Sequence, residues 1–152
     1  MTEKERLGWI EAIAWIVILI SVPAVAIPKY ADVKRRDSAA NVLSDVDIMR
    51  NAVFHFYSDS AYFPADSGGA IPESLTPYLP GSFSRSRAYG TLDYRNWPIL
   101  PPPGADSTAK SNVVGVTVTT KDPKVALTAA NLAPAAPRFT VDNKPTFLFF
   151  GS

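Results

Sequence analysis

Few side chains in this 152-residue chain have the type and spacing needed for catalysis. Cysteine is absent and His55 is the only histidine, which removes disulfides, thiol catalysis and cysteine-ligated zinc. No serine-hydrolase, zinc-protease or phosphate-loop motif occurs, and one histidine gives no second imidazole for a metal site. We therefore expect that the chain is not an enzyme, that it holds no cofactor, and that His55 is an ordinary packed or half-exposed residue.

Six aspartates from residue 59 onward carry the hard oxygen ligands that calcium prefers. They are Asp59, Asp66, Asp93, Asp106, Asp122 and Asp142. No pair has the spacing of an EF-hand loop, and Lys144 places a cation close to Asp142. The pattern favours turn-forming and capping acids, with calcium binding as the lesser alternative.

Glu11 is the one charged residue inside an apolar run from Leu7 to Pro28. As a helix, these 22 residues would extend roughly 33 Å, close to the ~30 Å hydrocarbon core of a bilayer. A carboxylate in such a run costs ~2.5 to 3.5 kcal/mol at the membrane centre and less near an edge. The run predicts a transmembrane segment, with a cleaved signal peptide and a buried soluble helix as alternatives. Glu11 then either contacts a neighbouring subunit or reaches water from the interface.

Apolar residues continue at three- and four-residue steps from Val33 to Tyr57, which indicates one face of a helix. The opposite face carries polar residues, Asp45 among them, and we expect that face to be solvated. No turn signal separates the two patterns, so they predict one helix over 7–58. Pro23 and Pro28 lie inside it and predict a bend.

The remaining residues predict an irregular loop followed by a small antiparallel sheet. A short helical turn is expected near 71–79, ended by Pro80 and Gly81. Strands are expected at 91–97, 112–120, 138–141 and 146–150, and a helix at 123–132 capped by Asp122. The three consecutive prolines at 101–103 predict a stiff linker. A net charge of +1 with mixed signs along the chain gives no basic face for nucleic acid.

The layout resembles the type IV pilins and the pseudopilins of type II secretion. Glu11 and Pro28 stand 17 positions apart, as do the family's N-terminal glutamate and its helix proline. The stretches 57–64 and 71–80 resemble the turn that follows the long helix in pseudopilins. The resemblance covers roughly residues 7 to 81. It implies a pilin-like α+β fold in which the long helix, transmembrane in its first half, packs on the sheet.

The resemblance also implies a processing site, and here the chain departs from the family pattern. Family members are cut after a glycine, which leaves a hydrophobic first residue and the glutamate fifth. Counting back from Glu11 makes Leu7 that first residue, but Arg6 precedes it; a cut after Gly8 would leave Trp9 first. Processing is therefore atypical or absent, and the N-terminal methylation found in the family becomes an open question.

From these patterns we expect four segments: a leader or cytoplasmic tail (1–6), a transmembrane helix (7–28), its amphipathic continuation (29–58) and a globular domain (59–152). The resemblance implies a structural subunit of a pilus or a secretion pseudopilus. Its partners would be other pilin-like subunits, an assembly platform in the inner membrane and the bilayer, with no nucleic acid.

The expected location is the inner membrane, with the C-terminal domain outside it. Lys29, Lys34, Arg35 and Arg36 follow the apolar run, and a count of positive charges alone would place that domain in the cytoplasm; we follow the family. The alternative function is a single-span binding module that does not polymerise and recognises an exported substrate or an envelope component.

Overall fold

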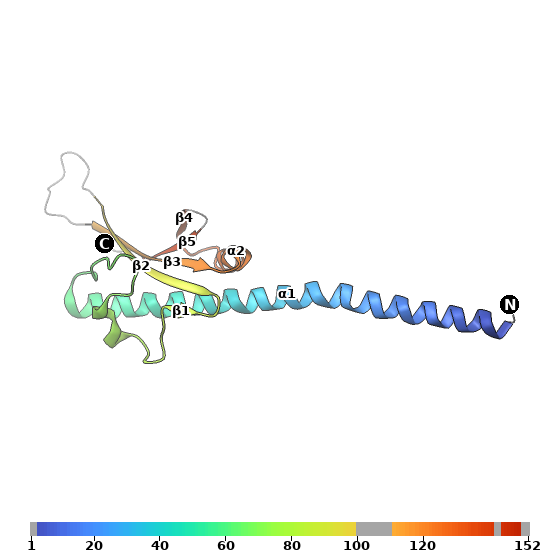
Figure 1. The fold of residues 1–152 in the computed structure, drawn as a ribbon. Coiled ribbons are helices and arrows are strands. Elements are labelled where there is room, and N and C mark those ends of the chain that lie inside the picture. Colours follow the sequence, from blue (N-terminus) through green and yellow to red (C-terminus); the bar gives the residue numbers. More distant parts are fainter. Residues whose placement is uncertain (1–2, 100–110, 142–143, 150–152) are drawn as a thin grey trace. The chain divides into compact units, whose positions relative to one another are not determined.

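The computed structural model describes residues 3–99, 111–141 and 144–149 (Figure 1). Within these ranges, the side chains of 3–7, 10, 12, 19–28, 111 and 141 lie outside the description. The predicted proline linker at 101–103, Asp106, Asp142 and the end of the last predicted strand fall outside the described residues, as do the side chains of Arg6, Leu7, Pro23 and Pro28. The predicted bend at these prolines stays a prediction.

The first element is α1, a helix over Glu3–Ser60. It begins four residues before the predicted start and ends two residues after the predicted end, so the prediction of a single long helix agrees with the structure. The chain divides into two compact units, 1–35 and 36–152. Over the part of the chain that the structure describes, no helix has the length and apolar content needed to cross a membrane.

In the second unit, α1 buries the face that the sequence predicts. Its buried residues recur at three- and four-residue steps: Ala39, Val42, Val46, Met49, Val53 and Phe56. Val33 was assigned to the same face, and that assignment is wrong, because its side chain is 65% exposed. The buried stripe begins at Ala39, in the second unit.

The rest of the second unit is a five-stranded antiparallel sheet with two short helices, so the fold is α+β as predicted. The strands are β1 (Ser86–Arg87), β2 (Gly90–Ile99), β3 (Ser111–Thr120), β4 (Arg138–Val141) and β5 (Lys144–Phe149). Their order is β1-β2-β3-β5-β4. The helices are η1 (Glu73–Tyr78, a 3₁₀ helix) and α2 (Pro123–Leu132).

Most of the predicted elements are confirmed, with differences at their edges. The sequence did not predict β1. β2 is three residues longer than the expected 91–97, with one added residue before that range and two after it. Lys144 belongs to β5 instead of the turn. β1 has only two residues, too few for an alternating pattern to be read. The predicted cap of α2 is confirmed, since the Asp122 carboxylate accepts from the Lys124 backbone N–H at 2.9 Å.

One hydrophobic core joins α1 to the sheet within the second unit. The alternation predicted for β3 is confirmed, because Val114, Val116 and Val118 are all buried and Thr117 and Thr119 lie on the other face. The remaining core residues come from the neighbouring elements and the segments between them: Phe63, Leu75, Tyr89, Leu92, Tyr94, Val125, Ala129, Phe147 and Phe149. The second unit therefore has a hydrophobic core of its own.

Candidate functional site

The first unit carries large apolar side chains that stay exposed, and we call residues 9–18 the apolar segment. Its exposed large side chains are between 50% and 66% accessible: Trp9, Ile13, Trp15, Ile16, Val17 and Ile18. Four of these are consecutive, and each helical residue advances by ~100°, so apolar groups surround the helix. Burying such a side chain fully is worth ~1.5 to 3 kcal/mol. The apolar segment therefore gains free energy from a bilayer or from other protein surfaces.

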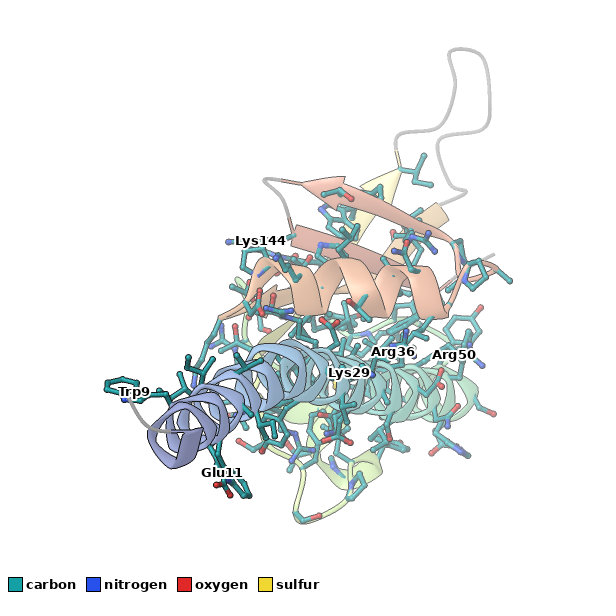
Figure 2. The ribbon with its side chains drawn as sticks, turned by 90° about the vertical axis from the view of Figure 1, so that its right-hand side faces the viewer. Trp9, Glu11, Lys29, Arg36, Arg50 and Lys144 are labelled. Atoms are coloured by element: carbon teal, nitrogen blue, oxygen red, sulfur yellow. The ribbon has the colours of Figure 1, made fainter. Side chains whose placement is uncertain are left out.

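Glu11 lies on the apolar segment, and its side chain is exposed. Figure 2 shows Glu11 and Trp9 projecting from α1 in different directions. A carboxylate in this setting can accept hydrogen bonds or pair with a cation supplied by another molecule. Such a pair would offset the cost of placing the charge in an apolar environment.

The residues around the predicted processing site lie on the same helical segment. Gly8 and Trp9 are exposed, and a Cβ added to Gly8 would meet no atom within 4 Å. Arg6, Leu7 and Pro28 also belong to α1. The structure thus brings Gly8, Trp9 and Glu11 into one short stretch, with Pro28 further along the helix.

The expectation that Asp45 is solvated is wrong, because Asp45 is buried at the contact between α1 and the sheet. Its carboxylate accepts from the Arg87 guanidinium at 2.8 Å and from the Tyr89 hydroxyl at 2.7 Å. Arg87 also lies over the Phe83 ring, 5.0 Å from its centroid. Two causes raise the pKa of Tyr89: burial has the larger effect, and the hydrogen bond to Asp45 has the next largest. We call Asp45, Arg87 and Tyr89 the buried polar cluster.

A hollow of about 350 Å³ opens beside the buried polar cluster, with Asn41 and Ser44 also in its lining. The helical period of the sequence could not reveal the buried polar cluster, because that period places Asp45 on the polar face of the helix. Its partners lie 42 and 44 residues further along the chain. The arrangement ties α1 to β1 and to the turn between β1 and β2, and we assign it a structural role.

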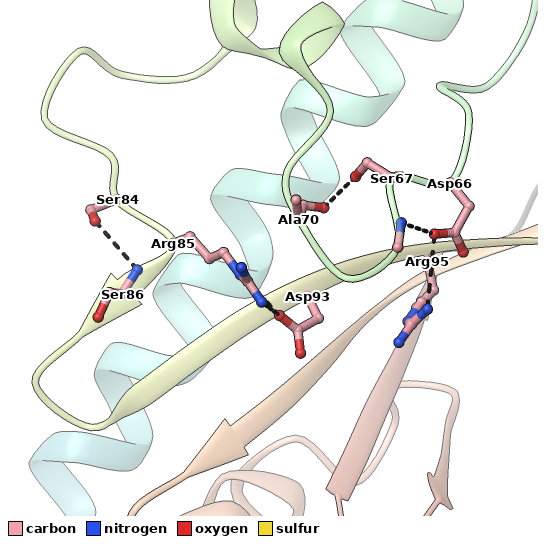
Figure 3. A network of polar contacts seen from close by, with 9 residues as sticks. Asp66, Ser67, Ala70, Ser84, Arg85, Ser86, Asp93 and Arg95 are labelled. Carbon is pink, nitrogen blue, oxygen red and sulfur yellow. Dashed lines mark hydrogen bonds and ion pairs between the residues drawn. The ribbon is translucent and has the colours of Figure 1, made fainter.

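The other aspartates near the sheet hold loops and strands in place (Figure 3). Asp66 accepts from the Gly68 backbone N–H at 2.7 Å and lies 3.9 Å from the Arg95 guanidinium. Asp93 pairs with Arg85 at 2.6 Å. The Asp66 contact agrees with the predicted role of the acids in turns, whereas Asp93 lies inside β2 and pairs with an arginine. Among the described residues, no three His, Cys, Asp or Glu side chains lie together as metal ligands would.

Two further predicted residues lie near the C-terminal end of α1. His55 is exposed, more so than the packed or half-exposed position expected for it. Asp59 accepts a hydrogen bond from the Tyr78 hydroxyl at 2.8 Å, which raises the pKa of that tyrosine. This bond connects the end of α1 to η1.

Comparison of the chain with models of protein families, with curated proteins and with solved structures finds no match.

Proposed function

We propose that this chain is a membrane-anchored structural subunit that assembles into a filament of the type IV pilus or type II secretion pseudopilus kind. One observation carries the proposal. The first unit exposes the apolar segment, whereas the second unit is an α+β domain that buries its own core. A domain that folds by itself has no need of an exposed apolar helix, and burial of that helix in a bilayer or among other copies would drive insertion and assembly.

In this proposal the fold is pilin-like and the apolar run 7–28 spans the inner membrane, with the C-terminal domain outside it. The helix leaves the bilayer when copies join the filament, and an assembly platform in the inner membrane carries out that step. Glu11 and Pro28 act in assembly: Glu11 fixes the register between neighbouring copies, and Pro28 adjusts the helix for packing. The exposed carboxylate of Glu11 supports this assignment.

The substitution Glu11→Leu tests the assembly role. Removing the charge lowers the cost of membrane insertion, so the variant should fractionate with membranes at least as well as the natural chain. Crosslinking between copies in those membranes should fall severalfold, because the contact that fixes register is lost. Asp47→Leu is the matched control, since it removes an exposed acid from α1 outside the apolar segment. Unchanged crosslinking in Glu11→Leu would overturn the assembly role.

The mass of the intact protein and its N-terminal sequence, both from native membranes, test the processing step. A first residue at Leu7 with an added methyl group would place the chain with the processed members of the pilin class. An N-terminus at Met1 would show that Arg6 and Gly8 are not part of a cleavage site.

A second candidate is the single-span module that binds an exported substrate or an envelope component without polymerising. Two observations favour it. Arg6 stands where the pilin class has glycine. In addition, Trp97 and Phe139 form an aromatic pair, with ring centroids 5.5 Å apart and Phe139 still 37% exposed. Absence of crosslinks between copies of the natural chain would favour this second candidate.

A further inference from the structure

The stretch of α1 that follows the apolar run carries a cluster of positive charge within the first unit. Lys29 and Lys34 are exposed. Arg35 pairs with Asp32 at 3.0 Å, and its side chain is 32% exposed. Three cations and one carboxylate give residues 29–35 a net charge of +2. We call Lys29, Lys34 and Arg35 the basic collar.

The spacing of exposed aromatic residues sets the depth of the basic collar relative to a bilayer. Trp9 and Tyr30 are 66% and 72% exposed and stand 21 positions apart on α1. That separation corresponds to ~32 Å along a helix, close to the ~30 Å hydrocarbon core. Tryptophan and tyrosine concentrate at the two membrane interfaces. With Trp9 at one interface and Tyr30 at the other, the basic collar lies at the level of the lipid headgroups.

The cations of the basic collar are distributed around the helix. At ~100° per residue, Lys34 and Arg35 point ~140° and ~240° away from Lys29. A protein partner docking on one side of the helix would meet only part of this set. Lipid headgroups surround a helix on all sides, so phosphates can reach each cation.

We infer that the basic collar binds the phosphates of anionic phospholipids on the side of the bilayer that faces the C-terminal domain. This inference rests on the membrane anchor of the proposed function. Each lysine near an anionic surface strengthens attachment by roughly fivefold, and the long lysine stems let the ammonium groups reach the phosphates from helix positions near the hydrocarbon edge.

The test uses the full chain in nanodiscs made of equal parts phosphatidylglycerol and phosphatidylcholine. After gentle release into detergent, native mass spectrometry measures the ratio of the two lipids that stay bound. The natural chain should retain phosphatidylglycerol severalfold over phosphatidylcholine, and the double variant Lys29→Gln/Lys34→Gln should lose most of that preference. The control is Lys121→Gln/Lys124→Gln, which removes the same charge from exposed positions of the second unit and should keep the preference.

Equal retention of both lipids by the natural chain, or an equal loss of preference in the control variant, would overturn the inference. Flotation with vesicles of pure phosphatidylcholine separates this failure from failure of the proposed function. A chain that floats with neutral vesicles but shows no lipid preference keeps its anchor and has no headgroup site. A chain that floats neither with these neutral vesicles nor with vesicles that contain phosphatidylglycerol lacks the anchor, and both proposals then fail.

Discussion

Residues 13–18 and 42–56 belong to the same helix, α1, yet they use apolar side chains in opposite ways. In the first stretch, large apolar residues occupy consecutive positions and are at least half exposed. In the second stretch, one stripe of apolar residues recurs at three- and four-residue steps and is at most 8% exposed: Val42, Val46, Met49, Val53 and Phe56. Phe54 lies off this stripe and is 41% exposed. A stripe needs one packing surface, whereas apolar residues on all sides need an apolar surrounding.

The difference indicates that the two parts of α1 depend on different environments. The second stretch draws its stability from the core of the α+β domain, which is present in the single chain. The first stretch would be stabilised by a bilayer or by other subunits. Substitutions in the second stretch should therefore change folding of the domain, and substitutions in the first should change insertion and assembly.

Met49→Ala should give the largest effect on folding, because Met49 is fully buried. Large-to-small changes at such positions cost ~2 to 5 kcal/mol of unfolding free energy. Denaturant unfolding of the full chain in mild detergent measures the loss. Ile16→Ala in the first stretch is the control and should change the unfolding free energy by less than ~0.5 kcal/mol. Similar losses in the two variants would contradict the division of α1 into two environments.

Asp45→Ala should be the next most damaging change. It leaves the Arg87 guanidinium and the Tyr89 hydroxyl without their acceptor in a poorly solvated place, at a cost of ~2 to 3 kcal/mol. Asp47→Ala is a matched control on the same helix, because Asp47 is exposed and lies 3.7 Å from Arg50. An exposed pair of this kind contributes less than ~1 kcal/mol. Equal effects of the two substitutions in denaturant unfolding would show that the buried polar cluster adds no stability.

Tyr89→Phe should have the smallest effect at neutral pH and a distinct one in alkali. Burial and the hydrogen bond to Asp45 raise the pKa of Tyr89 above its ordinary value of 10.0. The folded state therefore keeps this proton to higher pH than the unfolded state. The stability that depends on the proton is fully present below about pH 10 and is lost as the pH rises further.

The phenylalanine variant should lose ~1 kcal/mol at pH 7 and then lose less stability than the natural chain above pH 10. Tyr94, whose pKa is also raised by burial, keeps part of the alkaline dependence in both proteins. Unfolding curves recorded between pH 7 and 12 measure the difference. Tyr30→Phe, at an exposed position of the first unit, is the control, and its stability should match that of the natural chain at every pH. If the stability of Tyr89→Phe fell with pH as that of the natural chain does, the proton of Tyr89 would not be the cause of the alkaline loss.

The sequence by itself determined the types of the main elements and most of their boundaries. The helical period, the alternation in β3 and the Asp122-Pro123 cap are local signals, because each depends on residues within a few positions of one another. They were enough to predict α1, α2 and the four longer strands. The exposed apolar segment and Glu11 were also visible in the sequence, since a charge within an apolar run needs no knowledge of the fold.

Only the tertiary structure decided the strand order and the burial of Asp45. β5 pairs with β3 and β4 pairs with β5, and no local pattern states which strands become neighbours. β1 forms because Ser86 and Arg87 meet Thr91 and Gly90 across a turn. The helical period alone places Asp45 on the surface. Its burial depends on Arg87 and Tyr89, which lie more than 40 positions further along the chain. A buried carboxylate is stable only beside such partners, so its environment is a property of the folded chain.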